Sequence, residues 1–506
     1  MKKIISIAFA AVLAGFIISC QKENVLPELE VVPVQYTFNI SVNEQFGFDS
    51  GASTKGGSSA TYKTTWTSGD RIFLFFKPAS GDLLEDTYAT LLYNGSGWEG
   101  SVSGTSSLGE GGTLSAVYVY NLGCDVTPEF SGWQWIIATA DNVFYNCQAG
   151  LSYTVSGGEI TASLNLEAPA DFVQFYVKGG ASGPLTCDKV KGWKDVAIGS
   201  EMDIRNITST GYMNGFANSG DPNVMEYYGR LVRGTSLKDV NCKFTVVKNG
   251  KVYEHSATPG TTARGFSMNT TSWTEASGIL PGLFSIEQGS PVRFSQGNLY
   301  YDESEYLDES EQRIVTVGFC FETNQYDYQV TRTPKHVSYF YWSTNPEHAA
   351  KGYDTTGSTS SGDVIFSNDT ESMPKRNFTV NGVTGQFRTL SKDEWSYLFN
   401  HHSYKWVTVN GVKGYAIAPD GFDGTIADTY ADNAALATDN LLFLPAAGGE
   451  IEGLDDRYTE ENGFYWSSSS KSEKEAYGVW FHSSGVTTNY PEKRSSGYCV
   501  RLVKDC

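Results

Sequence analysis

The chain has 506 residues, a formal net charge of −20 at pH 7 and 19% charged residues. A chain of this length exceeds one ordinary core and predicts about two to four domains. The acidic balance argues against nucleic acid as a partner and against electrostatic docking on anionic lipid. The small charged fraction argues against a mainly helical or disordered protein, whereas 53 glycines and 30 tyrosines suit a surface protein built from strands and loops.

The N-terminus predicts export and lipid attachment. Two lysines precede an apolar run over residues 4–18, and residues 17–20 (IISC) have the pattern of a lipobox. The run is shorter than the roughly 20 residues of a membrane span, so it fits a cleaved signal peptide over residues 1–20. We expect the thiol of Cys20 to carry the lipid and to anchor a surface-exposed chain in a bacterial outer membrane. An ordinary signal peptide cut elsewhere, or an uncleaved anchor helix, is the alternative.

The cysteines predict disulfides without deciding their pairing. If Cys20 is lipidated, seven of the eight cysteines remain, and an odd number leaves at least one unpaired or paired between chains. Cys124 with Cys147, and Cys187 with Cys242, are plausible pairs because each pair lies within one expected domain. No spacing among the cysteines matches a zinc site, so we expect no structural metal.

Residues 21–34 form a polar, proline-containing tether, after which apolar alternation predicts strands. Glycine, serine and asparagine clusters separate these strands, and no helical period occurs before about residue 150, which is typical of a β-sandwich. The strand candidates of this first sandwich, residues 35–150, are 36–42, 71–76, 88–93 and 114–120.

A second β-rich stretch predicts another sandwich over residues 151–276. It contains strand candidates at 160–166 and 172–177. The segments 244–248 and 251–255 flank Asn249-Gly250, a two-residue hairpin turn that suits residues with positive φ. A linker over 277–282 follows.

The last part of the chain, residues 285–506, differs in kind and contains the clearest helix. Ser391 precedes an apolar periodic segment and Glu394 lies three residues later, which is the spacing of a capping box. Trp395, Leu398 and Phe399 then form one apolar face, which we interpret as core. Two Val-Asn-Gly-Val segments, beginning at residues 380 and 409, predict hairpin turns around the helix.

Six segments of this C-terminal part resemble, in order, the "major paralogous domain" group of surface proteins from Bacteroides-type bacteria. That group is similar to the C-type lectin fold and to formylglycine-generating enzymes. The resemblance therefore implies an α+β, C-type-lectin-like head. The matching segments are 292–299 (VRFSQGNL), 324–328 (NQYDY), 388–398 (RTLSKDEWSYL), 442–448 (LFLPAAG), 463–468 (GFYWSS) and 497–503 (GYCVRLV).

The two sandwiches resemble fimbrillin-type domains, the tandem β-sandwiches of pilus subunits and related surface lipoproteins. The residues that carry this resemblance are 63–76 (KTTWTSGDRIFLFF), together with the lipobox. The fold class is then mainly β: tandem fimbrillin-like β-sandwiches followed by the C-type-lectin-like domain. Such pilus subunits are typically cleaved after an arginine near the N-terminus, but the first arginine here is Arg71, inside an expected strand. Proteolytic maturation and polymerisation are therefore not implied.

Enzyme and metal signatures are mostly absent. No zinc-protease motif, nucleophile elbow or phosphate loop occurs, and the lectin calcium signatures Glu-Pro-Asn and Trp-Asn-Asp do not occur. Residues 420–424 (DGFDG) suggest calcium but lack the alternation of an EF-hand, so we expect a turn and no cofactor. The fold resemblance brings in cysteine oxidation, with Cys499 and either Cys320 or Cys506 as the reactive pair. A buried structural thiol is much more common, so we expect no enzyme.

A binding surface is predicted in the terminal region, which forms the ligand-facing side of C-type-lectin-like folds. Residues 477–481 alternate like a strand, with Tyr477 on one face and Trp480 and His482 on the other. Aromatic anchors beside adaptable polar groups are typical of binding patches. Equally, Trp480 could be core and the rest solvated loop. The candidate ligand-binding residues are Tyr477, Trp480, His482, Asn489, Tyr490, Lys493 and Arg494.

The order of tether, β-rich stalk and aromatic head predicts a cell-surface or fimbria-tip adhesin. Its partners would be the membrane, through the lipid anchor, and a host, microbial or glycan ligand bound by the head. A pilus anchor or accessory subunit, which binds pilus subunits, is one alternative, and a cysteine oxidase is another. The sequence leaves the identity of the ligand open.

Overall fold

The computed structural model describes most of the chain from residue 36 onward. The described residues are 36–42, 66–119, 126–138, 145–168, 170–217, 221–232, 234–262, 265–307, 313–328, 336–340, 342, 377–380, 383–450, 458–472 and 474–506, without the side chains of 206–208, 301–318, 336–337 and 377–386. The expected signal peptide, Cys20 and the tether lie outside these residues. No helix among the described residues is long and apolar enough to cross a membrane.

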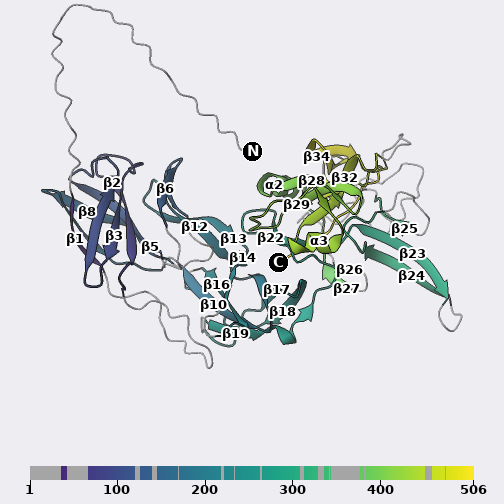
Figure 1. Cartoon of the computed structure of the whole chain (residues 1–506), viewed down its shortest axis with the longest axis horizontal. Helices are drawn as coiled ribbons and strands as arrows, with labels where there is room; N and C mark the ends of the chain where they lie inside the picture. The colour runs from purple at the N-terminus through teal and green to yellow at the C-terminus, as the bar shows by residue number, and fades with distance from the viewer. Residues whose placement is uncertain are drawn as a thin grey trace, which may run out of the picture.

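The chain is mainly β, as expected, and its N-terminal part is one seven-stranded sheet (Figure 1). The order across this sheet is β1 (Thr37–Val42), β9 (Glu159–Leu164), β8 (Tyr145–Ser156), β5 (Gly111–Val119), β2 (Arg71–Pro78), β3 (Tyr88–Tyr93) and β4 (Trp98–Ser103). The expected strands at 36–42, 71–76, 88–93 and 114–120 are therefore confirmed as β1, β2, β3 and β5, with ends that differ by at most three residues.

The seven-stranded sheet curls until its two edge strands, β1 and β4, face each other. Phe38 and Ile40 of β1 pack into the same core as Trp98 of β4. The ring of Phe38 covers Gly100, where an added Cβ would lie 2.2 Å from Cδ2 of that ring. Curling brings side chains of the two edge strands into one core, although β1 and β4 do not pair with each other and remain edges of the sheet.

A second, four-stranded sheet covers the outer face of β2. Phe73 and Phe75 project from β2 into a core that they share with Trp135 and Trp193 of this sheet. Its strands, in order, are β13 (Ile204–Thr210), β12 (Gly192–Ile198), β7 (Gln134–Ile137) and β6 (Pro128–Ser131).

The expected boundary between residues 150 and 151 is wrong. It lies inside β8, which pairs with β5 on both sides of that point, and the sheet continues to Leu164. Gly150 has φ +63° and the β5–β8 register shifts between Leu114 and Ala116. This glycine therefore marks a bulge within the strand and not a domain boundary. Strand β7, which lies in the expected first sandwich, pairs with β12, which lies in the expected second, and β6 joins that sheet through β7.

Two further sheets enclose one core over residues 171–275 and form what we call the central sandwich. The hairpin at Asn249-Gly250 is confirmed, with φ of 51° and 71° at these two residues. The strands are β15 (Gly215–Ala217), β16 (Val224–Leu231), β10 (Asp171–Lys178) and β19 (Gly265–Asn269) in one sheet, and β14 (Tyr212–Met213), β11 (Ser182–Cys187), β17 (Cys242–Lys248), β18 (Lys251–Ala257) and β20 (Thr274–Glu275) in the other, with the 3₁₀ helix η1 (Thr270–Ser272) between β19 and β20.

The C-terminal part, residues 284–506, is the head, and it combines helices with short sheets. Its helix α2 (Lys392–His401) begins with the expected capping box, because Ser391 Oγ accepts from the Glu394 N–H and Glu394 accepts from the Ser391 N–H. The apolar face of α2 is buried, as expected. The second helix is α3 (Asn433–Thr438), and the strands are β21 (Phe284–Ser285), β22 (Pro291–Phe294), β23 (Leu299–Leu307), β24 (Arg313–Phe321), β25 (His336–Val337), β26 (Asn377–Val380), β27 (Val383–Gln386), β28 (Tyr404–Val409), β29 (Val412–Ile417), β30 (Thr429–Tyr430), β31 (Leu442–Pro445), β32 (Asn462–Ser470), β33 (Glu475–His482), β34 (Gly485–Lys493) and β35 (Val503–Asp505).

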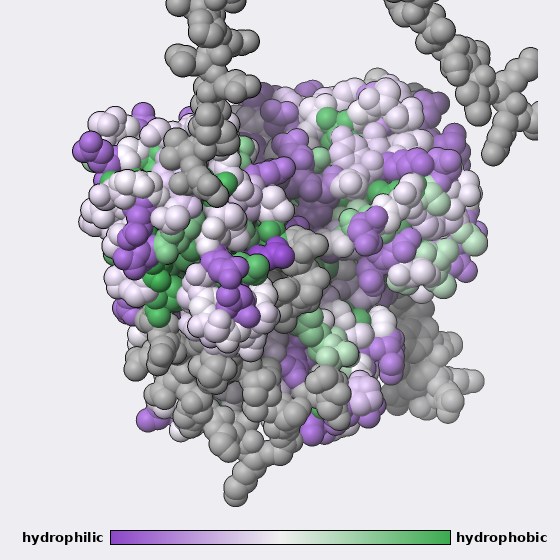
Figure 2. Space-filling model, turned by 60° about the vertical axis from the view of Figure 1, so that its left-hand side comes forward, coloured by the Kyte–Doolittle hydropathy of each residue, from purple (hydrophilic) through white to green (hydrophobic). Residues whose placement is uncertain are grey.

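The described part of the chain exposes few large apolar side chains. Figure 2 shows apolar residues on the visible face as separate small patches among hydrophilic ones. The large apolar side chains that are exposed in the described part of the chain are Leu92, Trp133, Val232 and Tyr404. Isolated apolar residues of this kind are normal on a protein surface.

Candidate ligand-binding surface

The predicted binding region lies on the three-stranded sheet β32-β33-β34 of the head. Val479 and Phe481 of β33 are fully buried in the core beneath α2. Trp480 and His482 alternate with them and are only half-buried on the opposite face. The sheet thus has one face in the core and one partly open face, as the strand pattern predicted.

Three rings on the open face form what we call the aromatic platform: Trp480, His482 and Tyr490. The ring centroid of Trp480 lies 4.9 Å from that of His482 and 5.4 Å from that of Tyr490, at tilted angles of 42° and 47°. All three side chains keep part of their surface in solvent. The sequence left open whether Trp480 belongs to the core or to the surface. In the structure its ring packs on Tyr490 and on the edge of the core, and part of it remains accessible to solvent.

A bulge brings Tyr490 beside Trp480. Gly478 pairs with Tyr490, but Trp480 pairs with Thr487, so the β33–β34 register shifts between them. Bulges re-aim side chains and are enriched near functional sites. Burial and the nearby Glu492 raise the pKa of Tyr490, so its hydroxyl stays protonated and available as a donor at neutral pH.

Two polar residues that the sequence interpretation missed fix the orientation of the platform. The Trp480 Nε1–H donates to Asn462 Oδ1 at 2.8 Å. The Ser484 N–H points at His482 Nδ1 at 3.4 Å, and the Ser484 hydroxyl lies 3.0 Å from the same nitrogen. When the Ser484 N–H donates to Nδ1, the hydrogen of a neutral His482 ring lies on Nε2. Asn462 of β32 lies opposite His482 of β33. An antiparallel alignment of residues 463–468 with residues 477–481 gives the same pairing, so the sequence alone could have identified Asn462.

The remaining predicted residues do not all join the platform. Asn489 is exposed next to Tyr490, and Lys493 is exposed at the far end of the strand pair, opposite Glu475. Tyr477 lies near α2, with Lys392 Nζ 5.8 Å from its ring centroid. Tyr477 is thus separated from the three clustered rings.

Arg494 must be removed from the predicted surface. Its side chain is buried, with the guanidinium 4.3 Å from the centre of the Trp342 ring. The same guanidinium donates to Ser470 Oγ at 2.8 Å and to the Ser472 carbonyl at 2.6 Å. These contacts hold the loop between β32 and β33 in place. The sequence predicted a charged, solvated loop after β34, but the chain turns inward there.

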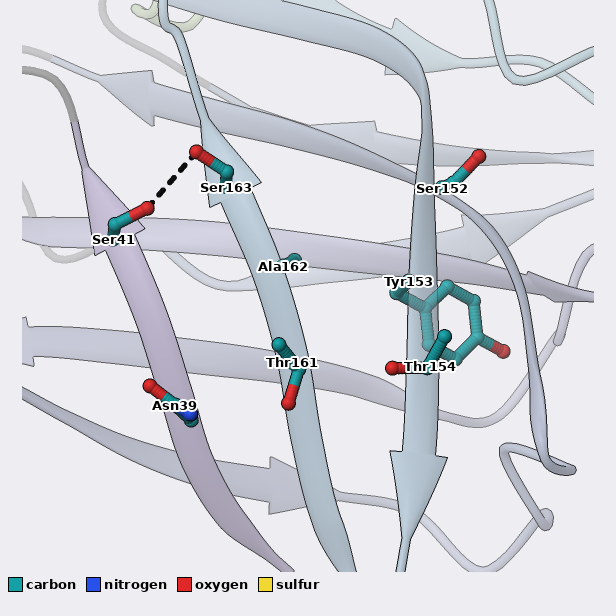
Figure 3. Close-up of a pocket in the computed structure, with 8 residues that line it drawn as sticks. All are labelled: Asn39, Ser41, Ser152, Tyr153, Thr154, Thr161, Ala162 and Ser163. Atoms are coloured by element: carbon teal, nitrogen blue, oxygen red, sulfur yellow. Dashed lines mark hydrogen bonds between the residues drawn. The ribbon is translucent and has the colours of Figure 1, made fainter.

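A second concave area lies on the N-terminal sheet and has different chemistry. The hollow, about 410 Å³, lies over β1, β9 and β8, and Ser41 hydrogen-bonds Ser163 within it at 2.9 Å (Figure 3). Its outward side chains are short hydroxyls and amides, without an exposed ring or a positive charge. The lining residues are Asn39, Ser41, Ser152, Tyr153, Thr154, Thr161, Ala162 and Ser163. This open hollow offers a ligand no exposed ring and no charged group, so the platform is the stronger candidate.

The structure also places the residues considered for catalysis and calcium. Cys499 is completely buried, and this burial raises the pKa of its thiol, which is the reverse of what a reactive cysteine requires. The Asp420 carboxylate accepts from Ser285 Oγ at 2.9 Å and lies 3.6 Å from His402 Nε2. Within the described residues no three His, Cys, Asp or Glu side chains gather in a metal-binding group.

The match to a known family model covers only part of the chain. A family model described as a domain of unknown function (DUF8237) matches residues 430–503, which include all of β33 and β34. No curated protein matches this chain.

Solved structures with some likeness come from Bacteroides. A candidate cell adhesion protein from Bacteroides fragilis NCTC 9343 is 12% identical with a TM-score of 0.25 over 59% of this chain and 100% of that one. A candidate adhesin from Bacteroides ovatus ATCC 8483 is 11% identical with a TM-score of 0.24 over 50% of this chain and 98% of that one. A fimbrial protein from the same strain is 11% identical with a TM-score of 0.20 over 93% of this chain and 99% of that one. Such low scores support no inference, so we base the function on this chain's own residues.

Proposed function

We propose that this chain is a lipid-anchored adhesin of a bacterial surface, whose head binds its ligand through the aromatic platform. The observation that carries the proposal is the joint exposure of Trp480, His482 and Tyr490 on one sheet face, held in place by Asn462. Rigid rings supply contact area at low entropic cost, and outward donors supply specificity.

The position of the platform in the chain supports an adhesive role. The lipobox at residues 17–20 is at the N-terminal end, whereas the platform belongs to the last structural unit, beyond the N-terminal sheet and the central sandwich. A ligand site at the end opposite to an anchor is what adhesion to another surface requires. The ligand classes that fit are a host or microbial surface protein and a glycan, both of which offer apolar patches beside hydrogen-bonding groups.

The test measures adhesion of the mature full-length chain, coupled to beads through its N-terminus, to a glycan array, mucin-coated glass and epithelial cells. We expect binding to at least one of these surfaces and a loss of at least tenfold in bound beads with Trp480→Ala. The matched control is Trp133→Ala, since Trp133 is a 53% exposed tryptophan on the β6–β7 hairpin.

Two outcomes would reject the proposal. Trp480→Ala could leave binding unchanged while circular dichroism shows an intact fold, or Trp133→Ala could remove binding equally. Either result would mean that the platform does not bind the ligand. The function would then be sought in the N-terminal sheet and the central sandwich, as expected of a pilus anchor or accessory subunit.

A further inference from the structure

Two buried thiols meet at one end of the central sandwich. Cys187 is the last residue of β11 and Cys242 is the first residue of β17. The two strands pair antiparallel with Cys187 opposite Phe244, so Cys242 lies two residues away on the same face. Both side chains belong to the same core, with exposed fractions of 4% and 0%.

Backbone contacts hold the two strand ends together at this point. The Asp188 N–H donates to the Lys243 carbonyl at 3.2 Å, and the Lys243 N–H donates to Asp188 Oδ1 at 2.8 Å. The chain then turns, because the Val190 N–H donates to the Cys187 carbonyl at 3.2 Å. The Cys242 thiol donates to the Val240 carbonyl at 3.5 Å, and the two cysteines are close enough for each to affect the pKa of the other.

We propose that Cys187 and Cys242 form a disulfide in the exported protein. Among the described cysteines these two alone share a hydrophobic core cluster, whereas Cys147 and Cys499 each lie in a different cluster without a second cysteine. An exported chain meets an oxidising environment, in which adjacent thiols are normally paired.

The oxidation occurs during folding, before β11 and β17 close on each other. Burial raises the pKa of Cys187 to about 12 and also raises that of Cys242, so neither folded thiol ionises at neutral pH. In the unfolded chain, one thiolate attacks the disulfide of an exported thiol–disulfide oxidoreductase and forms a mixed disulfide. The second thiolate displaces the oxidoreductase as a dithiol, so two electrons and two protons pass from the cysteines to that oxidant.

The first experiment maps the cysteines of the full mature protein purified from the exporting cell. The protein is unfolded and alkylated with iodoacetamide without reductant, and then digested and analysed by mass spectrometry. We expect the peptides of Cys187 and Cys242 to be joined and to become alkylated only after reduction, whereas Cys499 is alkylated in both conditions. Alkylation of Cys187 and Cys242 without reduction, or a bond from either one to another cysteine, would overturn the proposal.

A second measurement compares thermal unfolding with and without reductant. We expect reductant to lower the Tm of the wild-type protein by several degrees and to leave the Tm of the Cys187→Ala/Cys242→Ala variant unchanged. An equal shift in both proteins would assign the effect to other cysteines and contradict the proposal. Mapping of the wild-type chain remains decisive if the variant does not fold.

Discussion

The side chain of Asn462 controls the direction of Trp480 by accepting its indole N–H at 2.8 Å. In Asn462→Ala the indole loses this acceptor, but Trp480 is only half-buried, so water can replace it and the folded state should lose only about 1 kcal/mol. We expect the bead assay to show a severalfold loss of binding with this variant, because the ring is no longer held in one orientation.

The matched control for this variant is Asn39→Ala, which removes an exposed asparagine that hydrogen-bonds Glu159 on the N-terminal sheet. Binding that is unchanged in Asn462→Ala, or reduced equally in Asn39→Ala, would show that the Asn462–Trp480 contact has no role in recognition.

Asp86 makes the N-terminal sheet sensitive to acid. Hydrogen bonds from Ser106, Thr105 and Thr87 hold the pKa of the Asp86 carboxyl well below its usual range. The stability from these bonds is fully present above the unfolded-state pKa, about 3.9, and is lost as the pH falls through the lower folded-state pKa. We expect wild type to lose more urea resistance than Asp86→Asn between pH 5 and pH 3. Equal losses in both proteins would remove Asp86 as a source of the acid sensitivity.

At the scale of elements, β1 depends on a glycine in β4. The Phe38 ring of β1 lies where a Cβ on Gly100 would be, only 2.2 Å from Cδ2, so Gly100→Ala must displace either the ring or the strand. Because β1 is an edge strand bonded only to β9, we expect it to loosen. Hydrogen exchange measured by mass spectrometry should become faster in residues 37–42.

Gly97→Ala provides the control for this change, since nothing lies within 4 Å of an added Cβ at that position. Unchanged exchange in β1 of Gly100→Ala, or equal acceleration in both variants, would mean that contact between Phe38 and Gly100 does not hold the strand.

Local signals predicted the elements that depend on neighbouring residues. The α2 capping box needs only Ser391 and Glu394, and the turn at Asn249-Gly250 needs only two residues that accept positive φ. The Val-Asn-Gly-Val hairpin that begins at Val409 also formed, with Asn410 at φ +48° between β28 and β29. At Val380 the flanking strands β26 and β27 pair as predicted, although residues 381 and 382 themselves lie outside the described part.

Long-range pairing was not predictable in the same way. The parallel pairing of β1 with β9 joins segments about 120 residues apart, and nothing in either strand specifies the other. The boundary expected at residue 150 was wrong because the pairing of β8 with β5, about 35 residues away, is not visible in local composition. The inward turn of Arg494 depends on Trp342, which is remote in sequence, so local composition indicated a solvated loop instead. The platform was partly predicted because alternation in β33 is local, but its acceptor Asn462 is on another strand.

At the scale of the whole molecule, the head is joined to the central sandwich by several polar contacts. Arg293 of β22 is 1% exposed and donates to Thr245 Oγ1 of β17 at 3.5 Å and to the Pro281 carbonyl. Lys504 Nζ lies 2.6 Å from Glu254 Oε1 of β18. In Figure 1 the C-terminus accordingly lies beside β17. A load on the head therefore passes to the sheet that contains β17, where Cys242 is located.

The proposed disulfide would limit how far this loaded chain extends. Residues 188–241 lie between the two cysteines, and their full extension would add about 190 Å of contour length. In single-molecule pulling of the mature chain by its two ends, we expect this length to be missing from the oxidised protein and to be present after reduction. The Cys187→Ala/Cys242→Ala variant should give the longer contour in both conditions. Because a bound adhesin is pulled between its ligand and its anchor, a closed loop would keep β14, β15 and β16 of the central sandwich within reach of refolding. Equal contour lengths in the oxidised and reduced wild type would exclude this role.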